Sequence, residues 1–147
     1  MRGMTPVDRA ALLVQHEHLR SLMAQAETAG QALLAEERPS NRAATALQSA
    51  IHALRAGLLP HLADEEAALL PRLGALPDGA LRAALLKAEH TSERALLDLL
   101  SRVSEAGLVV CARRLVSFVG ELRQDMRFEE QELFAAAFEG GPHATPG

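Results

Sequence analysis

Four long segments in which apolar residues recur every three or four positions make up most of this 147-residue chain. That spacing places the apolar side chains on one face of an α-helix, whereas a strand alternates every second residue. Short runs rich in proline, glycine and small polar residues separate the segments. The pattern predicts helices over about 6–37, 41–74, 79–106 and 108–138.

Residues that favour helix ends mark these boundaries. Thr5 followed by Pro6 is typical of an N-cap and a first helical residue, and Ser40 and Asp78 are suited to cap the next two helices. Gly107 is a natural stop for the third helix. Because the connections are short, consecutive helices must run antiparallel. We therefore predict an all-α fold, an antiparallel up-down-up-down four-helix bundle.

Length and composition fit one such bundle. A chain of 147 residues has room for a single domain, with a core over about 7–138 and a flexible tail over 139–147. Apolar residues make up 48% of the chain, aromatic residues make up 3%, and there is no tryptophan or tyrosine. This composition indicates leucine- and alanine-rich helices rather than a β-sandwich.

Charge and cysteine content argue against several function classes. The chain has 15 Lys and Arg against 19 Asp and Glu, without a basic block, so we expect no nucleic-acid partner. No stretch approaches the roughly 18 apolar residues that a membrane span requires, so we expect no membrane association. Cys111 is the single cysteine and cannot form an internal disulfide. A reducing, cytoplasmic location is therefore the expectation.

A few polar residues interrupt the apolar faces of the predicted helices. On the first helix His16 lies within the apolar stripe, whereas His18 points away from it. On the second helix His52 likewise falls on the outer side. Six inward polar residues at similar depths in the bundle are predicted to meet: His16, His61, Glu65, His90, Asp125 and Glu129.

The polar residues repeat along the chain. The first and third helices each carry a histidine followed four residues later by arginine. The second and fourth helices each carry His61 or Asp125 followed four residues later by a pair of glutamates. The chain is therefore similar to two copies of one helical hairpin. The repeated pairs are His16/Arg20, His90/Arg94, Glu65-Glu66 and Glu129-Glu130.

Six buried polar side chains need partners that satisfy their hydrogen bonds or balance their charges. A single inward histidine is usually a hydrogen-bonded core residue, but each uncompensated buried polar group costs roughly 1–3 kcal/mol. Two divalent cations would nearly balance the three carboxylates, with Glu65 and Glu129 as bridging ligands. Nitrogen and oxygen donors without thiolate suit iron, manganese or zinc, and the oxygen donors favour ferric iron. We predict a metal centre with redox chemistry.

The same residues carry a family resemblance. The chain resembles the hemerythrin-like, or HHE cation-binding, family over about 7–138. The resemblance implies a four-helix bundle with a non-haem di-iron centre, bridged by carboxylates and an oxo or hydroxo group, that handles dioxygen, peroxide, nitric oxide or iron. It is carried by His16, by His61-Leu-Ala-Asp-Glu65-Glu66 with Leu-Leu-Pro71, by Glu89-His90, and by Arg127-Phe128-Glu129-Glu130 with Leu133-Phe134.

Two positions depart from the pattern of the family's oxygen carriers. Arg94 stands where they have a second histidine, and Asp125 stands where the fourth helix usually has one. The centre would be richer in carboxylates, so we expect sensing or redox turnover rather than reversible oxygen carriage. The short side chain of Asp125 leaves a mononuclear or loosely held site open.

Several alternatives stay open at this stage. The protein can be a metal-stabilised helical binding module without turnover, or a metal-free helical interaction domain. Glu66 and Glu130 are expected beside the ligands or on the surface, and Arg20 and Arg94 either pair with them or are surface charges. Cys111 is expected to be a small buried apolar residue.

Overall fold

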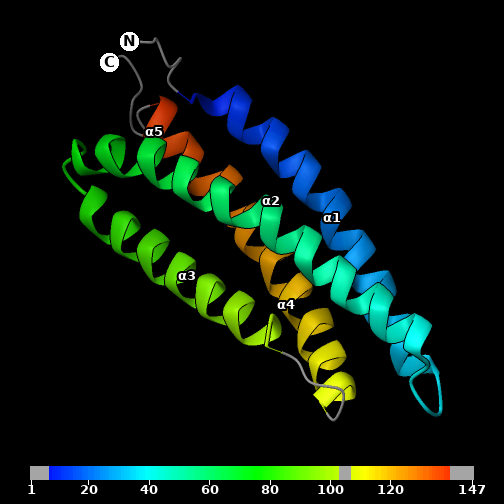
Figure 1. The fold of residues 1–147 in the computed structure, drawn as a ribbon. Coiled ribbons are helices and arrows are strands. Elements are labelled where there is room, and N and C mark those ends of the chain that lie inside the picture. Colours follow the sequence, from blue (N-terminus) through cyan, green and yellow to red (C-terminus); the bar gives the residue numbers. More distant parts are fainter. Residues whose placement is uncertain (1–6, 103–106, 140–147) are drawn as a thin grey trace, which may run out of the picture.

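The computed structural model describes residues 7–102 and 107–139, and within these ranges it is all-helical, with no strand. Consecutive long helices run in opposite directions, as Figure 1 shows, which confirms the predicted four-helix bundle. The last of the four long helices is continued by a short π-helix and a final α-helix. The elements are α1 (Arg9–Ala35), α2 (Asn41–Gly74), α3 (Gly79–Leu100), α4 (Leu108–Phe128), the π-helix η2 (Glu129–Leu133) and α5 (Phe134–Glu139).

Helix α1 begins later than predicted. Asp8 is extended and caps the helix, because its carboxylate accepts a hydrogen bond from the Ala11 N–H at 2.9 Å. A negative side chain at this end also interacts favourably with the helix dipole. The predicted helix was therefore wrong at Val7 and Asp8, and the predicted cap Thr5 and first helical residue Pro6 lie outside the described residues. Ser40 caps α2 as predicted, since its hydroxyl accepts from the Ala43 N–H at 3.1 Å.

Helix α3 ends earlier than predicted. Ser101 closes it at Leu100, because its N–H and its hydroxyl both donate to the Leu97 carbonyl, at 3.0 and 2.8 Å. The predicted extension to residue 106 was wrong at Ser101 and Arg102, and residues 103–106 lie outside the described part. At the other end of the chain, Glu139 is still helical, and the rest of the predicted tail, 140–147, is likewise outside the described part.

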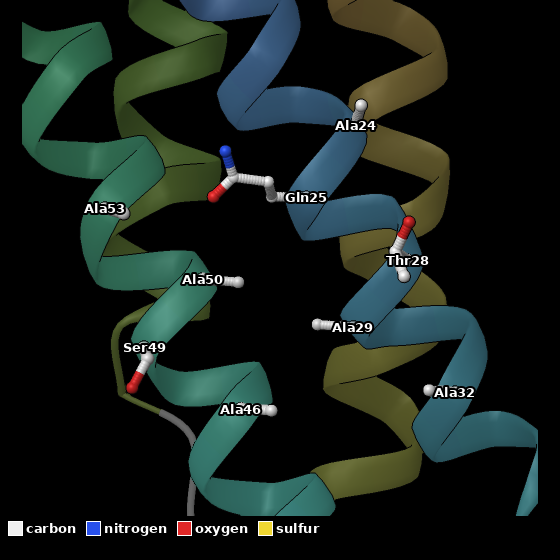
Figure 2. A pocket seen from close by; sticks show the side chains of 9 residues that line it. All are labelled: Ala24, Gln25, Thr28, Ala29, Ala32, Ala46, Ser49, Ala50 and Ala53. Carbon is white, nitrogen blue, oxygen red and sulfur yellow. The ribbon is translucent and has the colours of Figure 1, made fainter.

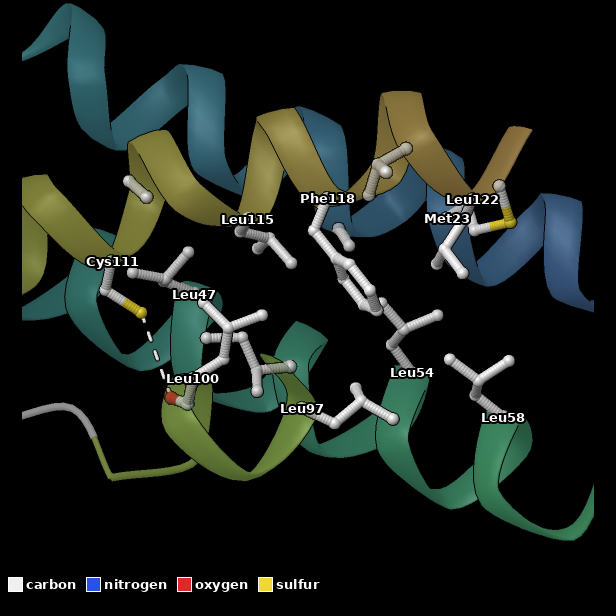
Figure 3. Close-up of a cluster of buried hydrophobic side chains, with 14 of the residues drawn as sticks. Met23, Leu47, Leu54, Leu58, Leu97, Leu100, Cys111, Leu115, Phe118 and Leu122 are labelled. Atoms are coloured by element: carbon white, nitrogen blue, oxygen red, sulfur yellow. Dashed lines mark hydrogen bonds between the residues drawn. The ribbon is translucent and has the colours of Figure 1, made fainter. Parts of the chain in front are cut away.

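The bundle core consists of two apolar clusters. The larger one joins α1, α2, α3 and α4 around Phe118, and the smaller one surrounds Phe134 at the other end of the bundle. In Figure 3 the side chain of Cys111 lies within the larger cluster, where its thiol donates to the Leu100 carbonyl at 3.8 Å. Burial raises the pKa of this thiol, so Cys111 is a buried apolar residue, as predicted.

An open groove of about 700 Å³ lies between α1 and α2 (Figure 2). Alanine side chains are too short to fill the space between the two helices here. None of the histidines or acidic residues predicted to bind metal lines this groove, so it is separate from the candidate site. Its lining residues are Ala24, Gln25, Thr28, Ala29, Ala32, Ala46, Ser49, Ala50 and Ala53.

None of the helices within 7–102 and 107–139 combines the length and the apolar character that crossing a membrane requires.

Candidate metal centre

A layer of polar side chains separates the two apolar clusters. Each long helix of the bundle has its polar residues between leucines of the two clusters, as His16 lies between Leu12 and Leu19 on α1. The layer residues are almost completely removed from solvent, with exposed fractions of 0–4%. Four helical elements, α1, α2, α3 and η2, contribute to it. Its members are His16, His61, Glu65, His90 and Glu129.

The three imidazoles contact the carboxylates of two glutamates. The Nε2 atoms of His16 and His61 each lie 3.1 Å from Oε2 of Glu65, and Nε2 of His90 lies 2.8 Å from Oε1. Glu129 is 3.3 Å from Nε2 of His16 and 3.9 Å from Nε2 of His90. All three Nε2 atoms therefore point to the same small space. The predicted inward directions of these five residues agree with this arrangement, and His18 and His52 are exposed as predicted.

The outer side of His16 is held by a charged pair. Its Nδ1 lies 2.7 Å from Oε2 of Glu130, which also accepts a hydrogen bond from Arg20 at 2.7 Å. A carboxylate on Nδ1 makes this nitrogen the proton donor and leaves Nε2 free to bind a cation. Of the alternatives left open by the sequence, the structure shows Glu130 beside His16 and paired with Arg20.

The outer side of His90 repeats this arrangement. Its Nδ1 lies 2.6 Å from Oε2 of Glu66, and Arg94 donates two hydrogen bonds to Glu66 at 2.7 and 3.0 Å. The repeated hairpin in the sequence therefore corresponds to a repeated orienting unit of histidine, glutamate and arginine. Arg94 does not enter the layer, because its guanidinium is engaged by Glu66.

His61 has a different outer partner, which the sequence analysis missed. Its Nδ1 lies 2.7 Å from Oε1 of Gln15, and the Gln15 amide donates to Asp64 at 3.0 Å. A polar residue directly before the inward His16 was the available signal, but helical spacing alone places Gln15 beside the stripe and not in it.

Asp125 is placed apart from the histidine layer. Carboxylate oxygens of Asp125, Glu89 and Glu93 lie within 4.8 Å of one another. Asp125 is not part of the cluster that contains His16, His61 and Glu65. Glu89 also lies within this distance of His90 and Glu129, so it connects the two groups.

The sequence analysis missed Glu89 and Glu93. The predicted stripe on α3 passed from His90 directly to Leu97, two helical turns later. Glu93 fills the position between them, and it is only 4% exposed. The gap in the stripe was the signal for it, because an inward position must recur every three or four residues.

The imidazoles and carboxylates of the layer shift each other's pKa values. Burial lowers the pKa of His16 and of His90, but the hydrogen bonds that the imidazoles donate to the surrounding carboxylates outweigh burial and raise both pKa values to about 10. Burial opposes ionisation of Glu65 as well, yet the three imidazoles hold its pKa well below the ordinary value. In the absence of metal the layer is therefore a proton-rich network of imidazolium and carboxylate groups.

The pKa values of two carboxylates on α3 are raised, whereas that of Glu65 is lowered. Burial, together with the neighbouring Glu129 and Asp125, raises the pKa of Glu89 to about 12. Burial and a hydrogen bond with Asp125 raise the pKa of Glu93 to about 10. Burial and the neighbouring carboxylates outweigh the positive charge of His90 beside Glu93, so these side chains take up protons, and a cation bound here would replace those protons.

The π-helix η2 carries the glutamate pair Glu129 and Glu130. Phe134 donates its N–H to the Glu129 carbonyl, five residues back instead of four. The helix predicted over 108–138 is present, with a π-helical turn within it at Glu129–Leu133. The wider turn keeps Phe134 fully buried and packs its ring against His16, with 5.3 Å between centroids, a contact that periodicity does not reveal.

The donor set fits a metal ion. His16, His61, Glu65 and Glu129 offer ligand atoms within 4.8 Å of one another, and all four are buried. Buried oxygen atoms of Glu89 and Glu93 have no hydrogen-bond partner in the described structure. Unpaired buried oxygens next to inward-facing imidazole nitrogens are expected where a cation completes the contacts.

Loss of an orienting glutamate is expected to weaken metal binding. Glu66→Ala removes the acceptor from Nδ1 of His90, and such changes cost roughly 10–100-fold in metal affinity. Calorimetric titration with Zn²⁺ measures this. Glu132→Ala, at an exposed position of η2, is the control and leaves the affinity unchanged. Equal affinities of the two variants would contradict the orienting role of Glu66.

Comparison with known proteins identifies the family. No curated protein and no solved structure shows a significant match to the chain. A family model described as the hemerythrin HHE cation binding domain matches residues 8–137, which include every residue of the polar layer. The match, the bundle and the cluster of histidines and glutamates indicate metal binding. The chain belongs to the hemerythrin HHE cation-binding domain family.

Proposed function

We propose that this protein holds a di-iron centre and acts on a small oxidant or gas, namely dioxygen, peroxide or nitric oxide, or on iron itself, by sensing or redox turnover. The observation that supports it most is the convergence of three Nε2 atoms on the carboxylates of Glu65 and Glu129 in a sealed layer. Iron held by nitrogen and oxygen donors supplies one-electron redox chemistry and an affinity for small ligands. Manganese and zinc are the other metals that these donors suit.

The two ion positions would share carboxylates. His16 and His61 would hold one ion, and His90 would hold the other, because these imidazoles approach Glu65 and Glu129 from different helices. Glu65 uses one oxygen for His16 and His61 and the other oxygen for His90. Both of its carboxylate oxygens would therefore serve as metal ligands.

Burial limits the size of the substrate. The layer residues have almost no exposed surface, and the groove between α1 and α2 is not lined by any of them. This favours diatomic gases, peroxide or a metal ion over a larger organic substrate. Glu66 and Glu130 are each 24% exposed at the side chain, so they connect Nδ1 of the two histidines to solvent and can exchange protons there.

The carboxylate-rich donor set favours turnover over reversible oxygen carriage. Glu89, Glu93 and Asp125 supply oxygen atoms on the side of His90, and hard oxygen donors stabilise the higher oxidation state of iron. The lone buried Cys111 supports a reducing compartment such as the cytoplasm.

Iron loading followed by rapid mixing tests the proposal. Protein loaded anaerobically with ferrous iron is expected to hold two ions per chain and to change its near-ultraviolet absorption within seconds of mixing with oxygen, peroxide or nitric oxide. The double variant His61→Ala/Glu65→Ala loses the iron, whereas His52→Ala, an exposed histidine on the same helix, keeps it.

The outcomes separate the candidate functions. Bound iron that raises the melting temperature but reacts with none of the three compounds would indicate a metal-stabilised binding module without turnover. A melting temperature indifferent to chelator, with no iron bound, would overturn metal binding altogether.

A further inference from the structure

The outer face of α3 carries exposed apolar side chains. Within 7–102 and 107–139, three of the five large apolar side chains that are exposed lie on this one helix. They are Leu81, Leu85 and Leu99, with exposed fractions of 69%, 45% and 45%. Figure 1 shows α3 at one side of the bundle. Its outer face is therefore open to a partner.

These leucines belong to a row with the spacing of a coiled-coil seam. Its positions alternate between steps of four and three residues, which keeps them on one side of a helix that packs along another helix. Every side chain of the row is exposed and uncharged. Single exposed leucines are common on protein surfaces, but a continuous row along a 22-residue helix is typical of an interaction site. The row consists of Leu81, Leu85, Ala88, Ser92, Ala95 and Leu99.

The row is complementary to itself when two copies of α3 lie antiparallel. A two-fold axis between Ala88 and Ser92 pairs each position of the row with another position of the row in the second copy. Small side chains then meet at the centre, where they allow the helices to approach closely, and leucines meet at both ends. The facing pairs are Leu81 with Leu99, Leu85 with Ala95, and Ala88 with Ser92.

A cavity lies where the most exposed of these leucines would dock. It has a volume of about 180 Å³, and residues from the end of α3 and the start of α4, among them Leu99 and Val110, line it. Val110 is 48% exposed and extends the apolar surface onto α4. In the antiparallel pair, Leu81 of the second copy lies opposite Leu99, at this cavity. The same contact forms twice, because the axis relates the two ends.

Charges at the ends of the row favour the antiparallel orientation. Asp78 and Arg102 each continue the spacing of the row by one further position, and their side chains are 71% and 73% exposed. An antiparallel pair brings Asp78 of each copy to Arg102 of the other. A parallel pair would instead place Asp78 against Asp78 and Arg102 against Arg102, which is unfavourable.

We propose that two copies of this chain associate through the outer faces of their α3 helices, antiparallel, about a two-fold axis between Ala88 and Ser92. The partner is a second copy because one face supplies both the protruding leucine and the cavity, and both the acid and the arginine. His90 is buried on the inner face of the same helix, so association leaves the polar layer of each copy closed. The inference goes beyond the proposed function and does not depend on it.

Sedimentation velocity over a range of protein concentrations tests the association. The expected result is a species with twice the 15.7 kDa mass of one chain, which dissociates on dilution. Leu81→Glu places a charge opposite Leu99 and is expected to raise the dissociation constant of the dimer roughly tenfold or more. Val14→Glu is the matched control and associates as wild type, because Val14 is also 69% exposed but lies on α1.

Three results would overturn the proposal, provided that circular dichroism shows unchanged helical content in both variants. The first is a wild-type protein that is monomeric at every concentration, which would leave this face to a different partner. The second is a dimer that Leu81→Glu does not weaken. The third is equal weakening by Leu81→Glu and Val14→Glu.

Exchange of the end charges tests the orientation. Asp78→Lys places a lysine opposite Arg102 of the second copy and is expected to raise the dissociation constant roughly fivefold. Asp78→Lys/Arg102→Asp is expected to restore the wild-type value, because opposite charges meet again at both ends. A parallel pair has like charges at both ends in the wild type and in both variants. Equal dissociation constants for the three proteins would therefore overturn the antiparallel orientation.

Discussion

Replacement of Glu65 by alanine is expected to destabilise the metal-free protein by about 3–5 kcal/mol, the range found when one partner of a buried charged network is removed. Glu65 is fully buried and accepts contacts from three imidazoles at 2.8–3.1 Å. Without it, these imidazoles lose their common partner, and the bundle also gains a cavity. Urea unfolding in the presence of chelator measures the change in free energy.

Two comparisons make this result specific. Glu121→Ala replaces an exposed glutamate on α4 and is expected to change the free energy of unfolding by less than about 0.5 kcal/mol. In addition, Glu65→Ala is expected to remove the stabilisation that metal gives to the wild type. A loss below 1 kcal/mol in chelator would mean that the layer does not depend on Glu65.

The metal-free protein is expected to lose stability as the pH rises from 6 to 9. His16 and His90 have folded-state pKa values of about 10, and those of Glu89 and Glu93 are about 12 and 10. All four are raised above their unfolded values, so the folded state binds more protons throughout this range. The imidazoles contribute fully below pH 6.5, and their contribution is lost as the pH approaches 10. The glutamates act in the same direction from pH 4.5 upward.

The expected loss of stability follows from the change in the free energy of unfolding per pH unit. Each additional proton held by the folded state lowers the free energy of unfolding by about 1.4 kcal/mol per pH unit. One such proton predicts a loss of about 4 kcal/mol between pH 6 and pH 9, measured by urea unfolding in chelator. With metal bound, the ions replace these protons, and stability is expected to increase with pH over the same range. Stability in chelator that stays constant or increases from pH 6 to 9 would contradict the assigned protonation.

The sequence was sufficient for the bundle because its information is local. Helical spacing of leucines, Ser40 as a cap and short connections each act within a few residues, and they define the number and direction of the helices. The inward directions of His16, His61, Glu65, His90 and Glu129 follow from the same spacing.

The cluster of carboxylates beside the histidine layer could not be predicted from the spacing of residues along single helices. Asp125 was predicted to join the histidines because helical spacing places it on the inward face of its helix at a similar depth. Its side chain instead meets Glu89 and Glu93, which belong to another helix. Contacts between side chains of different helices depend on helix rotation and separation, which spacing along one helix does not define.

The sequence by itself determined which faces of the helices are buried and that a layer of imidazole and carboxylate groups interrupts them, because helical periodicity fixes side-chain direction to within a fraction of a turn. Only the tertiary structure decided which atoms meet. It placed Glu66 and Glu130 on the histidine Nδ1 atoms, widened the turn at Glu129, and assembled Glu89, Glu93 and Asp125. The physical reason is that a ligand contact is specified within a few tenths of an ångström, and that precision arises from packing between helices.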